Sequence, residues 1–552
     1  MAETLSVATV QLNPCVGDIA GNLALALKGH AAAAEQGADI VVFSELFLIG
    51  YPPEDLVLKP AATAECAEAL RAFAAATRGG PASLLGLPWR TGGKLYNAVA
   101  LVRDGRAERI FCKRDLPNYA VFDEKRVFHG GPPARTFTLK GVTIGAPICE
   151  DIWSPGVCAS LRRHGAEILL VANGSPYRRS ALEQRIKTIR TRISETGLPL
   201  VYVNQLGGQD ELVFDGASMA FDRTGRQVQQ SPVFAPDVSL SVWRRGPHGL
   251  DCESAAMAPL PDRLEQDYRA MVMGLGDYVV KNRFPGVVLG LSGGIDSALS
   301  AIIAVDALGA EKVWCVMLAS RFTSEASLHD ARAMAANLGC RYDEIGIEPA
   351  VQAFSGMLAP QFKGRAPDTA EENIQSRVRG VTLMGLSNKF GHMVLTTGNK
   401  SEMAVGYATL YGDMCGGYNA LKDLYKTEVY AMARWRNEHR PAGLLGPAGV
   451  VTPERIITRA PSAELRADQT DQDSLPPYEV LDDILMGLVE GETSIDEIVG
   501  RGHDPRTVQR IENLLYVAEY KRRQAPPGVK IGPKNFGRDR RYPITNRYRD
   551  AE

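Results

Sequence analysis

Ser292-Gly293-Gly294-Ile295-Asp296-Ser297 lies between an apolar run at 286–291 and a second apolar run at 298–305. This order predicts a short strand, a tight glycine loop and a helix. The glycine pair lets the backbone approach a phosphate, while the serine hydroxyls and the first N–H groups of the helix supply donors. Asp296 would repel a phosphate unless a metal ion accompanies it. We therefore expect the loop to bind a phosphate together with its cation.

Two glycines at a strand-to-helix turn are ordinary, and only the serines and the aspartate at these offsets favour a phosphate site. The loop is not a Walker A motif, because no Gly-Lys-Ser/Thr follows it, and the chain has no GxGxxG. The six residues resemble the pyrophosphate-binding loop of ATP-pyrophosphatase enzymes, which cleave ATP to AMP and pyrophosphate. This resemblance implies ATP as a co-substrate with Mg²⁺, and ATP contacts from Gly290, Ser292, Gly293, Gly294, Ile295, Asp296 and Ser297.

Length and composition exclude few functions. The 552 residues predict more than one domain, and 45% hydrophobic with 23% charged residues is ordinary for a globular protein. The net charge of −2 favours no nucleic-acid partner, and no apolar run approaches the roughly 18 residues that span a bilayer. Nine cysteines lack CxxC or zinc spacing. We therefore expect reduced thiols in a cytoplasmic protein with neither a nucleic-acid nor a membrane partner.

Strands and helices alternate in the second half of the chain. Such an order predicts a doubly wound parallel sheet, and ligands bind such sheets at the carboxyl ends of the strands. The loop at 292–297 follows the first of these strands and should form part of that site. The predicted strands are 287–291, 313–318, 342–347 and 393–397, the last of which closes the sheet, and the predicted helices are 296–308, 325–338 and about 370–389.

Short apolar runs in the first half end at polar residues, as strands covered on both faces do. Three of them end before Glu45, Lys113 and Cys149. Each residue alone has an ordinary reading, as a solvated carboxylate, a surface charge and a small core residue. Together they suffice for amide hydrolysis: Cys149 attacks the carbonyl, Lys113 favours the thiolate and the oxyanion, and Glu45 carries protons.

The sequence around these residues resembles the three signature blocks of the nitrilase (carbon–nitrogen hydrolase) superfamily. The blocks lie at 43–52, 113–119 and 148–153, within a resemblance that extends from about residue 4 to residue 245. It implies an α-β-β-α sandwich with a catalytic triad. The implied residues are the triad Glu45, Lys113 and Cys149, a second catalytic glutamate at Glu124, and glutamine contacts at Tyr51, Tyr119 and Ser175.

A polar segment after the strand at 393–397 has the groups that a nucleotide site needs. An Asp and a Glu from different loops can hold Mg²⁺ against phosphates, and a Lys can neutralise the departing pyrophosphate, although a polar surface segment is the alternative. Residues 262–552 resemble the synthetase domain of NAD⁺ synthetases, and the short spacing in Thr397–Glu402 is similar to that of the glutamine-dependent branch. The resemblance implies metal ligands Asp296 and Glu402, further ATP contacts Thr397, Lys426 and Ser462, and deamido-NAD⁺ contacts Asn373, Arg377 and Asp413.

A Gly/Pro-rich stretch separates the two halves. We expect a nitrilase-like glutaminase domain at 1–245, a linker at 246–261 and a synthetase domain at 262–552. Residues 520–552 carry ten Lys/Arg against three Asp/Glu. A nucleic-acid tail is one reading of this basic arm, but no stacking module accompanies it. We expect instead an arm that covers the ATP site or a neighbouring subunit.

The two resemblances together imply glutamine-dependent NAD⁺ synthesis: ammonia from glutamine would amidate AMP-activated deamido-NAD⁺, in a homo-oligomer. One alternative is another ATP-pyrophosphatase amidotransferase, similar to GMP synthetase. A second is a non-catalytic scaffold with a nitrilase fold, which the presence of Glu45, Lys113 and Cys149 together disfavours.

Overall fold

The computed structural model describes residues 4–462, 464–466 and 469–550, and the contacts divide the chain into two compact units, Met1–Asp262 and Arg263–Glu552. Unit 1 extends past the domain end predicted at 245, because β15 (Gly249–Ser254) pairs antiparallel with β14 (Asp237–Gly246). The predicted linker at 246–261 therefore contains a strand. The glycines and proline at its start form the turn of a hairpin.

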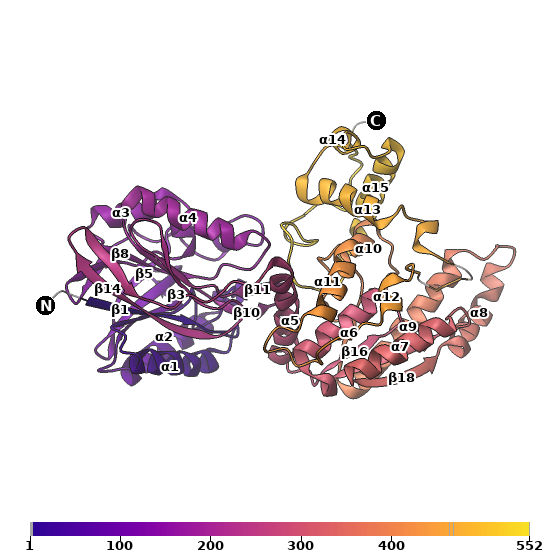
Figure 1. Ribbon diagram of the computed structural model, residues 1–552, viewed down its shortest axis with the longest axis horizontal. Helices are drawn as coiled ribbons and strands as arrows, with labels where there is room; N and C mark the ends of the chain where they lie inside the picture. The colour runs from indigo at the N-terminus through magenta and orange to yellow at the C-terminus, as the bar shows by residue number, and fades with distance from the viewer. Residues whose placement is uncertain (1–3, 463, 467–468, 551–552) are drawn as a thin grey trace. The chain divides into compact units, whose positions relative to one another are not determined.

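Unit 1 has four layers, with two sheets enclosed by helices (Figure 1). Helices α1 (Ile19–Glu35) and α2 (Pro60–Ala76) cover a seven-stranded sheet of order β15-β14-β1-β2-β3-β4-β5. Helices α3 (Pro155–Arg163) and α4 (Ala181–Thr196) cover a six-stranded sheet of order β13-β12-β9-β8-β7-β6. The predicted α-β-β-α sandwich is confirmed. The other strands are β1 (Thr4–Gln11), β2 (Ile40–Val42), β3 (Ala82–Thr91), β4 (Lys94–Arg103), β5 (Arg106–Cys112), β6 (Thr136–Leu139), β7 (Val142–Gly145), β8 (Ile168–Asn173), β9 (Leu200–Asn204), β10 (Leu206–Gln209), β11 (Leu212–Asp215), β12 (Met219–Phe221) and β13 (Gln227–Gln230).

Alternating side chains of the buried strands fill different layers of the core. In β2, Ile40 and Val42 pack between the two sheets, whereas Val41 packs under α1 and α2. Successive residues of a strand point to opposite faces, so a strand covered on both faces is apolar throughout. A third layer, with Leu169 and Ile189, joins the six-stranded sheet to α3 and α4. This packing fixes the strand ends at which the polar residues follow.

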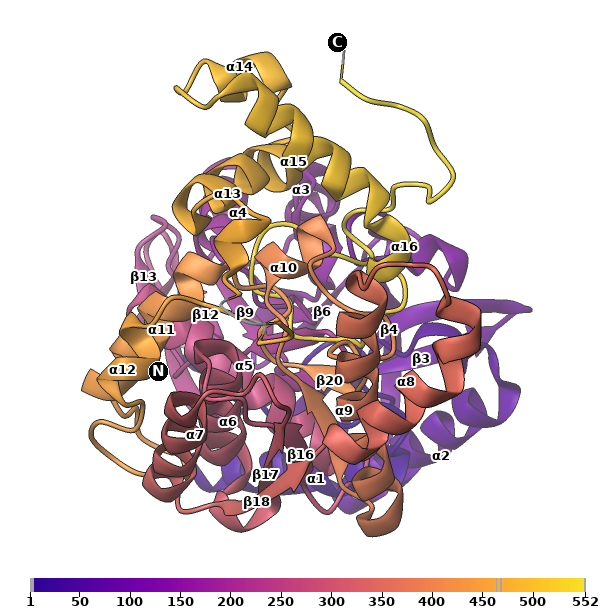
Figure 2. The same cartoon turned by 90° about the vertical axis from the view of Figure 1, so that its right-hand side faces the viewer.

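Unit 2 is built on a five-stranded parallel sheet of order β18-β17-β16-β19-β20. In Figure 2, α5, α6 and α7 lie on one face of the sheet and α8 and α9 on the other. The predicted doubly wound sheet is confirmed, but β19 does not close it, because the two-residue β20 pairs beyond β19. The strands are β16 (Val287–Gly290), β17 (Val313–Ala319), β18 (Arg341–Gly346), β19 (Met393–Thr396) and β20 (Tyr418–Asn419); the helices are α5 (Arg263–Lys281), α6 (Ile295–Leu308), α7 (Glu325–Leu338), α8 (Glu348–Phe362) and α9 (Thr369–Phe390).

Helices α10, α13, α14 and α15 bury a separate apolar cluster that includes Leu481, Ile498 and Leu515. Helix α10, which begins just after the glycine of the Thr397–Glu402 segment, packs against α11, α13, α15 and α16. No helix in the described part of the chain is both long enough and apolar enough to cross a membrane. The remaining α-helices of unit 2 are α10 (Lys400–Val405), α11 (Lys426–Glu438), α12 (Glu454–Thr458), α13 (Tyr478–Leu485), α14 (Ile495–Val499), α15 (Pro505–Val517) and α16 (Glu519–Arg522).

The basic C-terminal arm packs into unit 2. The backbone N–H groups of Ile531 and Gly532 donate to Asp423 at 2.7 and 2.6 Å, and the buried Lys530 pairs with Asp539. Among the described residues of the arm, Lys521 alone lines the cavity at the carboxyl ends of the unit 2 strands. The arm thus contributes to the cavity wall but does not cover the cavity, because Lys530, Lys534 and Arg540 pair elsewhere. The alternative, that the arm covers a neighbouring subunit, stays a prediction.

Candidate active sites

The structure brings Glu45, Lys113 and Glu124 of unit 1 into direct contact. Glu45 follows β2, Lys113 follows β5, and Glu124 begins a single 3₁₀ turn. The Lys113 Nζ lies 2.7 Å from Glu45 Oε1 and 2.8 Å from Glu124 Oε1, and Glu45 and Lys113 are fully buried. Burial alone would lower the pKa of Lys113, but the Glu124 and Glu45 carboxylates raise it well above its usual value. The ammonium is therefore held in its charged form between two carboxylates.

Three further groups fix the two glutamates. Asn97 Nδ2 donates to Glu45 Oε1 at 2.7 Å, and the Gly174 N–H donates to Glu45 Oε2 at 2.9 Å. Tyr51 Oη donates to Glu124 Oε1 at 2.8 Å, and burial raises the pKa of Glu124. Both oxygens of Glu45 thus accept from rigid donors, so its carboxylate has one orientation. The motifs did not identify Asn97 or Gly174; a buried Asn in the apolar strand β4 is the signal that was available.

Cys149 begins a 3₁₀ turn (Cys149–Ile152) just beyond β7 and has a φ of 44°, which is unusual for a residue other than glycine. Burial raises the pKa of its thiol well above 9.0, and the Glu45 carboxylate raises it further, whereas Lys113 lowers it. Lys113 thus favours the thiolate, as predicted, but burial and the Glu45 carboxylate outweigh its charge in the unliganded site. A thiol with a raised pKa needs a base to remove its proton during attack.

The Asp151 carboxylate joins the cysteine turn to the Lys113 segment. It accepts from the Ile148 N–H at 3.0 Å and from the Arg114 and Asp115 N–H groups at 2.9 Å each. Burial raises the pKa of Asp151 to about 7, although these backbone donors oppose the rise. Two of the three predicted catalytic loops are thus tied together by one side chain.

Tyr119 and Ser175, predicted as glutamine contacts, both lie on loops near Cys149. The Tyr119 hydroxyl donates to Glu150 Oε2 at 2.9 Å, while half of the tyrosine side chain is exposed. The Ser175 hydroxyl accepts from the buried Arg185 at 3.0 Å. Tyr119 is thus accessible to a ligand, whereas the side chain of Ser175 is held by its own unit.

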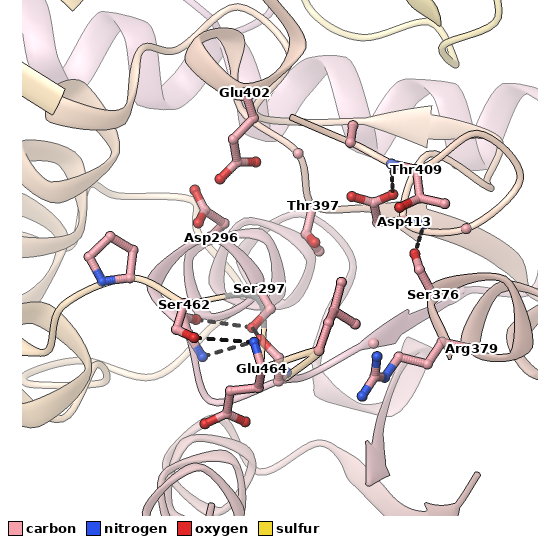
Figure 3. A pocket seen from close by; sticks show the side chains of 18 of the residues that line it. Asp296, Ser297, Ser376, Arg379, Thr397, Glu402, Thr409, Asp413, Ser462 and Glu464 are labelled. Atoms are coloured by element: carbon pink, nitrogen blue, oxygen red, sulfur yellow. Dashed lines mark hydrogen bonds between the residues drawn. The ribbon is translucent and has the colours of Figure 1, made fainter. Parts of the chain in front are cut away.

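Unit 2 contains a cavity of about 560 Å³ at the carboxyl ends of its strands, as Figure 3 shows from close by. Its walls come from the loop after β16, from α9, and from segments around residues 397–413 and 459–471. The structure thus assembles residues that are more than 160 positions apart in the sequence. The predicted residues that line the cavity are Gly290, Ser292, Gly293, Gly294, Ile295, Asp296, Ser297, Asn373, Thr397, Glu402, Asp413, Lys426 and Ser462.

The glycine loop at the first strand end has the shape of an anion site. Gly293 has a φ of +80°, and a Cβ there would lie 2.5 Å from the Ser327 carbonyl oxygen, so no other residue fits without movement. The Ser297 hydroxyl lies 3.1 Å from that of Ser292 and donates to the Gly294 carbonyl at 3.0 Å. Helix α6 begins at Ile295, so its first N–H groups are directed at this loop.

Asp296 and Glu402 face each other across the cavity, as Figure 3 shows, with Lys426 between them. The Lys426 Nζ pairs with Asp296 and lies 3.2 Å from Glu402 Oε1, and Asn399 Nδ2 donates to Asp296 at 2.9 Å. Burial raises the pKa of Glu402 to about 8; Asp296 adds to the rise and Lys426 opposes it. Two carboxylates that face the glycine loop suit Mg²⁺.

Helix α9 supplies one wall of the cavity. Asn373, Ser376 and Arg379 line it, and the Ser376 hydroxyl accepts from the Asp413 N–H at 3.2 Å. Arg377 is exposed, donates to the Leu410 carbonyl at 3.2 Å and does not line the cavity, because one residue along a helix turns the side chain by about 100° from Ser376. The structure therefore places Arg379, and not Arg377, at the wall.

The segment after α12 forms the remaining wall. Ser462 donates to the Gln469 carbonyl at 2.5 Å, and Glu464 accepts from Ser327 at 2.7 Å and from Arg459 at 2.7 Å. Sequence reasoning missed Arg459 as well as Arg379 and Lys521. These residues belong to no recognised motif, and only the tertiary contacts place them at the cavity.

Two family models match the chain, one in each half. Residues 6–241 match the model described as Carbon-nitrogen hydrolase, and residues 267–525 match the model described as NAD synthase. The glutamine-dependent NAD(+) synthetase of Rhodobacter capsulatus is 52% identical over 551 residues and covers 100% of both chains. That of Xanthomonas campestris pv. campestris is 48% identical over 99% of this chain and 98% of its own. A solved structure of glutamine-dependent NAD+ synthetase from Acinetobacter baumannii in complex with adenosine diphosphate has a TM-score of 0.78 and 40% identity, with both chains covered to 100%.

The raised pKa of Glu402 predicts a pH-dependent stability. Between the ordinary pKa of 4.5 and about 8, the native state holds a proton that the unfolded chain has lost, so rising pH lowers the free energy of unfolding. Glu402→Gln removes this dependence. The melting temperature of the variant minus that of the unsubstituted protein should therefore rise by at least about 2 °C from pH 5.5 to pH 8.5, as measured by calorimetry. A difference that stays constant with pH would contradict the assignment.

Proposed function

The chain belongs to the glutamine-dependent NAD(+) synthetase family, and on that premise we propose that unit 1 releases ammonia from glutamine and unit 2 uses it to amidate deamido-NAD⁺ at the expense of ATP. The observation that carries the proposal is the presence in one chain of two assembled sites, a buried Glu-Lys-Cys cluster and a phosphate-loop cavity. Each site supplies what the other needs, since an activated carboxylate requires a nucleophile and released ammonia requires an acceptor.

In unit 1, the Cys149 sulfur attacks the amide carbon of glutamine while Glu45 takes the thiol proton. The neutral thiol makes this base necessary, and the fixed orientation of the Glu45 carboxylate serves the transfer. The C–N bond then breaks, Glu45 returns the proton to the nitrogen, and ammonia leaves a thioester on Cys149. The Lys113 ammonium stabilises the oxyanion of the tetrahedral intermediate.

Hydrolysis of the thioester restores Cys149. Glu45 takes a proton from water, the resulting hydroxide attacks the thioester carbon, and the sulfur leaves with a proton as glutamate forms. Glu124 keeps Lys113 in place through this cycle, since it accepts from the same ammonium. Tyr119, with its exposed ring, and the Ser175 loop are the proposed contacts for the rest of the glutamine molecule.

In unit 2, the nicotinate carboxylate of deamido-NAD⁺ attacks the α-phosphorus of ATP, and the bond to the β-phosphate oxygen breaks. The N–H groups at the start of α6, with Ser292 and Ser297, hold the departing pyrophosphate, and Lys426 balances its charge. Asp296 and Glu402 would hold Mg²⁺, which when bound neutralises phosphate charge. The complex of the Acinetobacter baumannii relative with adenosine diphosphate supports nucleotide binding by this fold.

Ammonia then attacks the carbonyl carbon of the acyl-adenylate, and AMP leaves to give NAD⁺. Asp413 lies in the same wall as Asn373 and Ser376, where it can accept the proton that the attacking nitrogen loses. We place the dinucleotide along α9, with Arg379 in the role first assigned to Arg377. ATP would then bind at the opposite wall of the cavity, which the glycine loop forms.

We further propose a cytoplasmic homo-oligomer. All nine cysteines are free thiols, which supports a reducing compartment. Helices α8 and α9 expose Phe354, Met357, Val381 and Phe390, with Met357 and Val381 at 68% and 67% exposure, and such a surface supports self-association. A molar mass of 59.8 kDa by light scattering at micromolar concentration would contradict it.

Cys149→Ala separates the two activities. We expect NAD⁺ formation with glutamine to fall by at least about 10³-fold, because no other group can form the thioester. Formation with added ammonium should stay within about threefold of the unsubstituted protein, because unit 2 is unaltered. Chromatography of NAD⁺ and AMP measures both rates. Loss of both would show that the proposed division of labour is wrong.

Lys426→Met tests the cavity of unit 2. Removing the ammonium leaves Asp296 and Glu402 unbalanced and the pyrophosphate without its cation, so NAD⁺ formation should fall by at least about 100-fold with either nitrogen source. The exposed Lys389 at the end of α9 provides the control, since Lys389→Met should leave both rates unchanged. Equal effects of the two substitutions would mean that Lys426 has no special part in the reaction.

A further inference from the structure

The buried side chain of Arg185, in α4, has no role in the reaction proposed above. It is 1% exposed and donates four hydrogen bonds. Three of them go to one loop: Nε to the Ser175 hydroxyl at 3.0 Å, and Nη2 to the Ser175 and Pro176 carbonyls at 2.8 and 2.9 Å. The fourth, from Nη1, goes to Asp215 at 3.0 Å. Three of its four hydrogen bonds thus hold the turn at 174–176.

This turn touches both the base and the proposed glutamine contacts. The Gly174 N–H donates to Glu45 Oε2 at 2.9 Å. A Cβ on Gly174 would lie 2.7 Å from the Tyr51 ring, so the turn is pressed against the tyrosine that holds Glu124. A displacement of the turn would therefore change the orientation of the Glu45 carboxylate and shift Ser175 at the same time.

Ordinary packing does not account for a guanidinium at this position. Taking a charge out of water costs several kcal/mol, and a buried ion pair often contributes less to stability than apolar residues of similar size. Asp215, itself 1% exposed, balances the charge, and Asn204 supports the same turn by accepting from the Ser175 N–H at 2.9 Å. The planar guanidinium holds donors in fixed directions, which a lysine ammonium cannot reproduce. The buried guanidinium therefore fixes the geometry of the turn, at a cost in stability that an apolar side chain would avoid.

We propose that Arg185 is a positioning residue of the glutaminase site: with Asp215 as counter-ion, it fixes the 174–176 turn, and through that turn the Glu45 carboxylate and the Ser175 contact to glutamine. The inference rests on the proposed function of unit 1. Arg185 reaches the reaction only through the turn, so both the binding of glutamine and the proton transfer depend on it.

Arg185→Met and Arg185→Lys, assayed in the full chain, measure this dependence. For Arg185→Met we expect kcat/KM for glutamine to fall by at least about 100-fold, with a raised KM and a lowered kcat, because ångström-scale misplacement of reacting groups costs about that much. Arg185→Lys should be intermediate. NAD⁺ formation with ammonium should stay within about threefold for both.

Arg192 provides the matched control. It lies seven residues further along α4, is also buried, and pairs with Glu195 at 2.8 Å but does not touch the turn. Arg192→Met should therefore destabilise unit 1 without changing kcat/KM for glutamine more than about threefold. An equal loss in both Met variants would overturn the proposal.

The double variant Arg185→Met with Asp215→Leu separates positioning from stability. Replacing both members of a buried ion pair with apolar residues can restore the melting temperature, but it cannot restore the bonds to the turn. We expect this variant to melt near the unsubstituted protein and to keep the 100-fold defect with glutamine. Recovery of kcat/KM together with the melting temperature would show a merely structural role. Failure of the unsubstituted protein to use glutamine would instead refute the proposed function.

Discussion

A buried lysine ammonium shared between two carboxylates from separate segments of the chain holds each of the two candidate sites together. Lys113 lies between Glu45 and Glu124, and Lys426 lies between Asp296 and Glu402. A buried charge is tolerated only when it is paired, so each lysine requires its carboxylates to converge. The strands and helices that position these residues are in turn fixed by the apolar layers behind them. The fold and the sites thus depend on the same contacts.

The two clusters share this arrangement but differ in their surroundings. In unit 1, burial and the Glu45 carboxylate raise the pKa of the Cys149 thiol, so the proposed attack needs Glu45 as a base. In unit 2, burial raises the pKa of Glu402 to about 8, and the two carboxylates lie beside the glycine loop and the start of α6. Carboxylates next to such an anion site suit a divalent cation with its nucleotide. We therefore interpret the first cluster as a proton-transfer site and the second as a phosphate site.

The alternation of strands and helices predicted the parallel sheet of unit 2, whereas the α-β-β-α layers of unit 1 were implied by the nitrilase resemblance. Apolar runs of strand length report burial directly, so the polar residues that follow those runs were also predicted. It failed where long-range contacts decide. Helix α8 was missed because it buries only Val351 and so has no apolar face, and β15 was hidden by the glycines of its hairpin. Arg379 belongs to no local pattern, Asn97 is marked only as a polar residue in an apolar strand, and both reach the sites through tertiary packing. The catalytic and binding roles stay predictions that the geometry makes testable.

Isotope transfer from the carboxylate of deamido-NAD⁺ tests the central claim most directly, namely that the cavity of unit 2 joins this carboxylate to the α-phosphate of ATP. The substrate carries ¹⁸O in both carboxylate oxygens, and the products formed with glutamine are analysed by mass spectrometry. The account predicts one ¹⁸O in AMP, one in the carboxamide of NAD⁺ and none in pyrophosphate, since the oxygen that attacks phosphorus leaves with AMP. Unlabelled AMP would contradict it.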